Sequence, residues 1–300
     1  MSHLTRVRWA VPIAAMLLLA ACQGGGSTSP SAEESEAAEA SESAEASPSA
    51  SEAAQWETLV PGVLTVAVPH FPYPGYIEGE DPTAPTEGYY VSMMEEVADE
   101  LGLEIDYISA DFTAMMGQQF NDYDIMMTTL SITPERQETF DMTEPVVTFY
   151  EAIMVREGTS VATAEEVRNL KLGVCGTCRL FTFITDVIKP HVEPAALAED
   201  LQKYDALAAG QIQGALGDLL VIMAKGQEAN YAGLVAGCKF EPPSEAAWAL
   251  PKDHDITDTV NDVIERMRDD GTLAELDEEF LVPLAGGGDP AAVPACPSFE

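Results

Sequence analysis

Basic side chains are scarce in this sequence. Its 300 residues carry 14 Lys and Arg against 51 Asp and Glu, for a formal net charge of −37 at pH 7. Such a chain repels phosphate groups, which excludes nucleic acid as a partner. The four histidines are also few and scattered, and none falls at ligand spacing, which excludes a zinc site. We expect no metal and no cofactor, and we attribute the acidic excess to solubility in a salty exterior.

No second hydrophobic span follows the apolar run near the N-terminus. Residues 6–22 read RVRWAVPIAAMLLLAAC, in which two arginines precede an apolar run that ends in small residues. This pattern is typical of a secretory signal peptide and is too short to span a membrane as a stable helix. The ending LAAC resembles a bacterial lipobox, so we expect a signal peptide over 1–21 and a lipid on Cys22. The alternative is an ordinary signal with an incidental cysteine.

The stretch that follows lacks large apolar side chains altogether. Residues 23–55 consist almost wholly of Gly, Ser, Ala, Pro and Glu, and their seven glutamates repel one another. Such a segment cannot bury enough surface to fold. We therefore predict a lipidated, disordered tether over 22–55, which holds the folded part at the outer face of the cell membrane.

Beyond the tether, strand and helix signals alternate in two α/β series. Strands are expected at residues 64–68, 104–109, 123–127, 170–175, 214–218 and 246–251, and helices at 91–102, 112–120, 180–188, 198–210, 218–227, 255–271 and 272–281. The apolar stretches 146–156 and 246–251 look like two crossings between lobes. We predict a first lobe from 56–148 and 249–281, a second lobe from 149–248, a tail over 282–300, and a ligand cleft between the lobes.

The stretch TTLSITPERQETF places an arginine beside a run of hydroxyls. Arg136 falls one turn into a helix that Thr133 caps, directly after a strand. A helix N-terminus and a guanidinium together match a carboxylate, and Thr129 and Ser131 would orient it. The alternative is a capped helix whose arginine pairs with a surface acid.

A carboxylate receptor in an amino-acid site also needs a partner for the ammonium group. Asp218 ends the predicted strand GALGD and is the candidate for this role. The alternative for a single aspartate in so acidic a chain is a solvated surface acid.

The chain resembles the family 3 extracellular solute-binding proteins, the amino-acid receptors of ABC importers. The segments that carry the resemblance run in family order: LTVAVPHFPYPGY, DFTAMM, DIMMTTLSITPERQETFDMTEP, LKLGVCGT and DDGTLAELDEEFL. They cover roughly residues 58–281, and the part around 131–136 is the most specific. The resemblance implies an α/β, two-lobed type II periplasmic-binding-protein fold with two hinge crossings and a cleft.

The resemblance also implies roles for the site residues. Arg136 would hold the α-carboxylate with Ser131 and the backbone near Thr129, and Asp218 would hold the α-ammonium. Tyr73 and Phe112 would sandwich the ligand side chain. Thr177 and Cys178 would belong to a loop that also meets the carboxylate. The alternative for the two aromatics is core packing.

Several positions depart from the family pattern. Pro69 and His70 stand where the family often has an acidic residue, and the usual Thr-rich loop reads CGTCR. Arg179 closes that loop, and we expect it to pair with a surface acid. If it faces the cleft instead, it would favour a polar or acidic ligand side chain, and our choice is an amino acid such as glutamine or glutamate.

Four cysteines follow the tether: Cys175, Cys178, Cys238 and Cys296. An exported chain favours disulfides, and four cysteines allow three pairings. We favour Cys175 with Cys178 and Cys238 with Cys296, the second of which would hold the tail. CGTC is also a redox pattern, but no thioredoxin-like series surrounds it.

We therefore expect a monomeric binding protein that delivers a free amino acid to the permease of an ABC importer. One alternative is a dehydratase on the same fold, which needs a general acid near a leaving hydroxyl. The other is a sensory or cell-surface lipoprotein that binds a ligand without transport.

Overall fold

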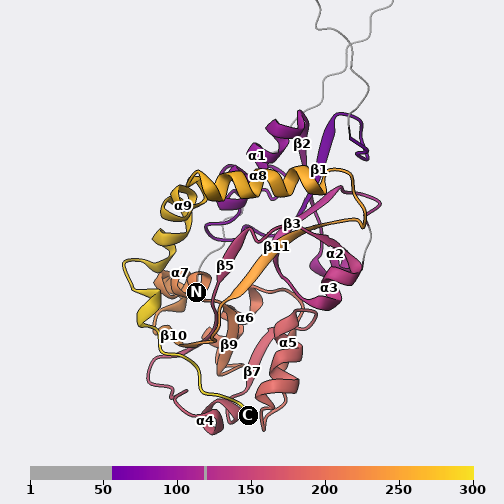
Figure 1. Cartoon of the computed structure of the whole chain (residues 1–300). Coiled ribbons are helices and arrows are strands. Elements are labelled where there is room, and N and C mark those ends of the chain that lie inside the picture. The colour runs from indigo at the N-terminus through magenta and orange to yellow at the C-terminus, as the bar shows by residue number, and fades with distance from the viewer. Residues whose placement is uncertain (1–55, 118–119) are drawn as a thin grey trace, which may run out of the picture. The chain divides into compact units, whose positions relative to one another are not determined.

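The structure of this chain is a computed structural model that describes residues 56–117 and 120–300 (Figure 1). The predicted signal peptide, lipidated Cys22 and tether lie outside the described residues. The described part holds two sheets with helices around each, which confirms the predicted two-lobed α/β class. Among these residues, no helix has the length and apolar character needed to cross a membrane.

The first lobe is built on a six-stranded sheet in the order β2-β1-β3-β11-β4, with β5 also paired to β11. Its strands are β1 (Val63–Val68), β2 (Glu104–Ser109), β3 (Ile125–Ser131), β4 (Asp141–Met142), β5 (Val147–Phe149) and β11 (Ser244–Leu250). Its helices are α1 (Tyr89–Leu101), α2 (Phe112–Met116), α3 (Pro134–Thr139), α8 (Thr257–Asp269) and α9 (Thr272–Leu276). Helix α1 is followed by the C-cap Gly102, whose φ of 67° is left-handed, a conformation that glycine adopts readily.

The second lobe is built on a five-stranded sheet in the order β10-β6-β9-β7-β8. Its strands are β6 (Glu151–Arg156), β7 (Leu172–Cys175), β8 (Ala195–Leu197), β9 (Gly214–Asp218) and β10 (Leu234–Lys239). Its helices are α4 (Ala164–Arg168), α5 (Arg179–Phe183) with a π-helical continuation (Ile184–Ile188), α6 (Gln202–Ala208) and α7 (Leu219–Gln227). A capping box is present at the start of α4, where the Thr163 side chain accepts from the Glu166 backbone N–H and the Glu166 side chain accepts from the Thr163 backbone N–H. Strands β8 and β10 were not predicted.

Two crossings join the sheets, and one of them differs from the prediction. The first lies at Tyr150, between β5 and β6, inside the predicted stretch 146–156. The second lies at 240–243, between β10 and β11, so the prediction of 246–251 was wrong. The apolar run 246–250 is instead buried in the first sheet, where β11 pairs with β3, β4 and β5. The first lobe therefore resumes at Ser244 rather than at residue 249.

The C-terminal tail passes back to the second lobe. After α9, a π-helical turn (Asp277–Leu281) leads into a 3₁₀ turn (Val282–Ala285). There the Leu284 carbonyl accepts a hydrogen bond of 2.8 Å from the amide of Gln227 in α7. Further on, Ala295 forms a parallel bridge to Lys239 at the end of β10, and Cys296 is disulfide-bonded to Cys238. The tail thus makes a third connection between the lobes.

Candidate functional site

A cavity between the lobes is lined by residues at or just after the carboxyl ends of β1, β3, β7 and β9. Open α/β sheets bind ligands at this end of their strands. All eight residues that the sequence suggested for ligand binding lie along the cavity: Tyr73, Phe112, Thr129, Ser131, Arg136, Thr177, Cys178 and Asp218. The fold therefore brings together residues that are far apart in the sequence.

Arg136 lies in the first turn of α3, directly after β3. Thr133 caps this helix, as predicted, because its side-chain oxygen accepts from the Arg136 backbone N–H. The guanidinium donates a 2.7 Å hydrogen bond from Nη1 to the Ser131 carbonyl. Burial and the nearby guanidinium of Arg179 lower the pKa of Arg136 to about 10. Within residues 56–117 and 120–300 Arg136 forms no ion pair, so the surface acid considered as its alternative partner is not there.

Asp218 ends β9 and caps α7. Its Oδ1 accepts from the backbone N–H groups of Leu220 and Val221 at 2.7 and 3.2 Å, and its Oδ2 accepts from the Tyr76 hydroxyl at 3.1 Å. Only 5 % of the residue is exposed, so it is not the solvated surface acid of the alternative interpretation. Burial raises the pKa of Asp218 to about 6. A carboxylate has about four acceptor sites, which leaves Oδ2 able to accept another donor.

Arg179 lines the cavity and forms an ion pair with Glu151. The prediction that Arg179 pairs with a surface acid was wrong, because its partner Glu151 is only 9 % exposed and also lines the cavity. Glu151 opens β6 and lies directly opposite Asp218 in the β6–β9 register. The two carboxyl-bearing residues therefore share one face of the second sheet. The sequence interpretation missed Glu151, which stands inside the apolar run VVTFYEAIMV.

The two predicted aromatic residues line the cavity from the first lobe and also pack against buried hydrophobic clusters, of which the one beside Tyr73 includes residues of both lobes. The Tyr73 ring lies 5.3 Å from the ring of Tyr76, centroid to centroid. Burial raises the pKa of Tyr73 well above its ordinary value, so the phenol stays protonated. Phe112 opens α2, whose N-cap is Asp111. Each ring thus combines the cavity-lining and the core-packing alternatives.

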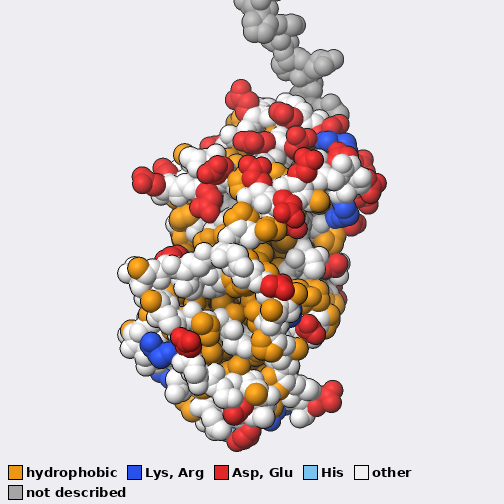
Figure 2. Space-filling model, turned by 90° about the vertical axis from the view of Figure 1, so that its left-hand side faces the viewer, with side chains coloured by type: hydrophobic (Ala, Val, Ile, Leu, Met, Phe, Trp, Pro, Cys, Tyr) orange, Lys and Arg blue, Asp and Glu red, His pale blue; other side chains and the backbone are white. Residues whose placement is uncertain are grey.

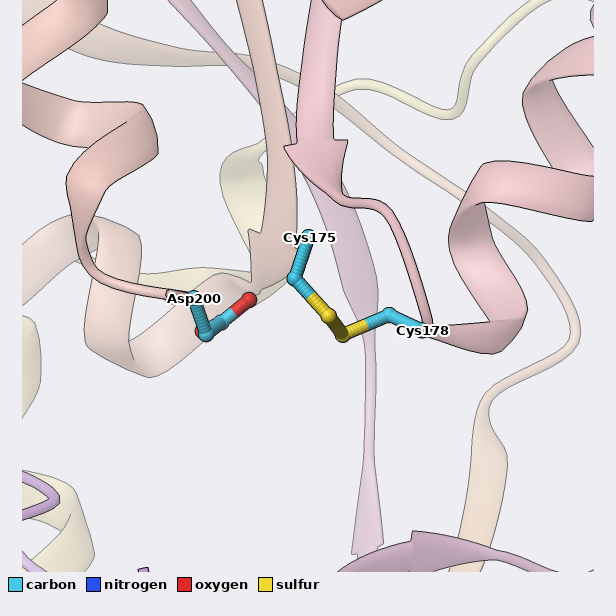
Figure 3. Close-up of side chains that lie close together, drawn as sticks. All are labelled: Cys175, Cys178 and Asp200. Carbon is cyan, nitrogen blue, oxygen red and sulfur yellow. A yellow bond between two sulfur atoms is a disulfide. The ribbon is translucent and has the colours of Figure 1, made fainter. Parts of the chain in front are cut away.

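The CGTC loop brings a disulfide to the cavity wall. Cys175 at the end of β7 is bonded to Cys178, and Cys238 is bonded to Cys296, which are the two pairings favoured from the sequence. Figure 3 shows the carboxylate of Asp200 turned toward the first of these bonds. The sulfur atoms and an Asp200 oxygen lie within 4.8 Å of one another, but the two sulfurs are joined and do not form a thiolate pair. Thr177, between the cysteines, receives a 3.4 Å hydrogen bond from Thr113 of the first lobe.

A buried lysine, which the sequence interpretation missed, completes the second-lobe wall. Lys203 lies in the first turn of α6, is 2 % exposed, and lines the cavity. Its Nζ donates to Asp200 Oδ1 at 2.5 Å. The available signal was its spacing: Lys203 stands three residues after Asp200 and four before the buried Leu207.

The cavity gathers cations that are rare elsewhere in the chain. Three of the 14 basic residues line it, namely Arg136, Arg179 and Lys203, together with five acidic residues, namely Asp111, Glu151, Glu199, Asp200 and Asp218. On the face drawn in Figure 2, by contrast, red acidic side chains gather over the upper part of the molecule. The basic side chains of the cavity are therefore placed where anionic groups of a bound ligand can reach them.

Comparison with known proteins shows the family of this chain. The family model of bacterial extracellular solute-binding proteins, family 3, matches residues 64–283. The probable amino-acid-binding protein YxeM of Bacillus subtilis is 22 % identical over 200 residues, which is 65 % of this chain and 75 % of YxeM.

Two solved structures share the fold. The solute receptor for L-cysteine of Neisseria gonorrhoeae has a TM-score of 0.67 at 20 % identity, covering 77 % of this chain and 95 % of that one. The binding protein AbpA of Streptococcus pneumoniae, bound to L-arginine, has a TM-score of 0.66 at 19 % identity, covering 75 % of this chain and 96 % of that one. Because the family model spans well over half of the chain, this protein belongs to the bacterial extracellular solute-binding proteins, family 3.

Proposed function

We propose that this protein binds a free α-amino acid between its lobes and delivers it to the permease of an ABC importer. One observation carries the proposal. Within the described part of the chain, Arg136 is the one cavity-lining Lys or Arg without an ion pair, and Asp218 is the one buried acid of the cavity without an ion pair. Asp111 and Glu199 are also unpaired among the described residues but are partly exposed. A zwitterion supplies the two missing partners at once.

The hydrogen bonds already made leave both groups able to bind. Arg136 uses one donor on Ser131, and its guanidinium has five, so a carboxylate can still accept a forked pair. Asp218 keeps acceptor capacity at Oδ2 for an ammonium group. In this arrangement Tyr73 and Phe112 border the ligand side chain, and Thr177 adds a hydroxyl to the carboxylate from the second lobe.

Delivery to a permease, the monomeric state and the lipid anchor on Cys22 are parts of the same proposal. Delivery draws support from the family and from a relative named as a probable amino-acid ABC transporter-binding protein, and the lipid anchor from the LAAC ending of the apolar run 6–22. The side chain that we favour is polar, as in glutamine or glutamate.

Titration calorimetry with the common amino acids tests the proposal. We expect saturable binding of at least one of them, with one ligand per protein. Thermal melting gives a second readout, since a ligand at a hundredfold its dissociation constant stabilises by about 2.7 kcal/mol. Binding of no amino acid would overturn the proposal.

The raised pKa of Asp218 favours one second candidate, a dehydratase. A carboxyl group with a pKa of about 6 is suited to general-acid work at neutral pH. Against this, its two oxygens already accept three hydrogen bonds that hold it in place. Incubation with prephenate-like and arogenate-like acids decides between the classes, because turnover would favour the enzyme.

A further inference from the structure

The buried ammonium of Lys203 has more donors than partners. Its side chain is 2 % exposed, and an ammonium group carries three N–H donors. In the described residues its one hydrogen-bond partner is Asp200, at 2.5 Å. A buried charge with unused donors is costly, so further acceptors at this point would be stabilising.

A glycine makes room for this ammonium beside β9. A Cβ atom built on Gly217 would lie 2.8 Å from Lys203 Nζ and 3.0 Å from the Tyr204 hydroxyl oxygen. Both groups therefore approach the bare backbone of Gly217, the residue before Asp218. Gly217 lines the cavity, and the buried Tyr204 hydroxyl has no hydrogen-bond partner in the part of the chain that is described.

The acceptor side of this subsite is Asp200. Its side chain is 21 % exposed, so it is open to the cavity that it lines. Asp200 and Lys203 together present an acceptor and a donor 2.5 Å apart with no net charge. A neutral group that has its own acceptor and donor side by side matches this pair, and a carboxamide is such a group.

We propose that the pair of Lys203 and Asp200 selects an amino acid whose side chain ends in a neutral carboxamide, as in glutamine or asparagine. The amide oxygen accepts from Lys203 Nζ, and the amide nitrogen donates to the Asp200 carboxylate. This inference rests on the proposed amino-acid function. A cationic side chain meets the Lys203 ammonium, and an acidic one meets the Asp200 carboxylate, so each leaves a repulsion that the amide avoids.

Calorimetry with glutamine, asparagine, glutamate, arginine and methionine tests the selection. We expect one of the two carboxamides to bind at least about tenfold more tightly than glutamate, arginine and methionine, because a site built for hydrogen bonds rejects analogues that lack them. Glutamate, arginine or methionine binding as tightly as the better carboxamide would overturn the inference while leaving the proposed function intact. No binding of any amino acid would instead refute the proposed function, and this inference with it.

Variants of the two residues should shift the selection in opposite directions. Lys203→Met leaves the Asp200 carboxylate without its cationic partner and should move the preference toward arginine. Asp200→Asn leaves the Lys203 ammonium without its anionic partner and should move the preference toward glutamate. Because this change is near-isosteric and the position is half-buried, the test can still be made if Lys203→Met does not fold. Equal losses for every ligand in both variants would overturn the inference.

The matched control is another lysine–carboxylate pair with a spacing of three residues, which lies outside the cavity. Lys225 donates to Glu228 at 2.7 Å, three residues on, and neither lines the cavity. Lys225→Met should leave the ranking of the five ligands unchanged. A changed ranking in this control would mean that loss of any lysine alters selection, which would also overturn the role of Lys203.

Discussion

The two walls of the cavity differ in how they hold charge. The first-lobe wall carries one cation, Arg136, whose hydrogen bond goes to the backbone, and one acid, Asp111, whose side chain caps α2. The second-lobe wall carries two ion pairs, Arg179 with Glu151 and Lys203 with Asp200, beside the unpaired Asp218. The first wall is therefore suited to the carboxylate that every α-amino acid shares. The second wall combines Asp218, suited to the ammonium group that every α-amino acid shares, with two ion pairs. These ion pairs can distinguish one ligand side chain from another.

Removal of the first-wall cation should have the largest effect. Arg136→Ala leaves the ligand carboxylate unpaired in a buried site, at about 3–5 kcal/mol, which is a loss of hundreds- to thousands-fold in affinity. Calorimetry with the tightest-binding amino acid measures it. Arg266→Ala, at a guanidinium 45 % exposed on α8, is the control and should bind as the unchanged protein does. Near-normal binding by Arg136→Ala would mean that the first wall is not the carboxylate site.

Loss of the second-wall charge should cost somewhat less. Asp218→Asn keeps a side-chain oxygen that can cap α7, so the fold should be retained. The ligand ammonium loses its charged partner, and we expect affinity to fall by about 10- to 100-fold, since hydrogen bonds to charged groups contribute roughly 1.5–3 kcal/mol. Thermal melting of the ligand-free variant separates binding from stability. Unchanged affinity would remove Asp218 from the ammonium site.

The pH dependence of affinity should sharpen the same assignment. Because burial raises the pKa of Asp218 to about 6, the ligand-free protein must lose this proton to bind an ammonium group. Affinity should therefore fall as pH drops below about 6, by up to about tenfold per unit. Calorimetry between pH 4.5 and 8 measures it, and Asp218→Asn should flatten the profile. An equally steep profile in that variant would assign the proton elsewhere.

The stability of the ligand-free protein should change in the opposite sense. A raised carboxyl pKa means that the folded state keeps a proton that the unfolded chain has released. The Asp218 contribution to the free energy of unfolding therefore falls as pH rises from about 4 through about 6.

The smallest effect should come from the hydroxyl that reaches across the cavity. Thr177→Ala removes one neutral hydrogen-bonding group, for which we expect a loss of about two- to tenfold in affinity, equivalent to roughly 0.5–1.5 kcal/mol. Thr182→Ala, at an exposed position in α5 that does not line the cavity, should have no effect on calorimetric titrations. A hundredfold loss in Thr177→Ala would make the second wall as important for the carboxylate as the first.

The first wall was readable from the sequence because its signals are local. Thr133, Pro134 and Arg136 form a capped helix start directly after an apolar strand, and each has the predicted place. The left-handed stop at Gly102 is local in the same sense. Such features follow from hydrogen bonding within a few residues, so they do not depend on the rest of the fold.

The second wall was harder to read because its partners are far apart or its signals are weak. Glu151 and Arg179 are 28 residues apart, and an acid within an apolar run gives no sign of its partner. Strand β10 contains Gly237 and a register shift between Ala236 and Cys238, which breaks the alternation that identifies a strand. Strand β8 is three residues of Ala, Ala and Leu, too short and too weak in strand preference to be noticed.

The Cys238–Cys296 bond also changes how this molecule would respond to force. The two cysteines are 58 residues apart, and the covalent ring that they close contains β11, α8 and α9. If the two chain ends are pulled apart in a single-molecule experiment, tension passes through the sulfur bridge and the ring adds no contour length. A reducing buffer should release that hidden length, roughly 200 Å at 3.3–3.6 Å per residue. Strand β11, which lies between β3 and β4 in the first sheet, would thus be shielded from direct load for as long as the bridge is intact.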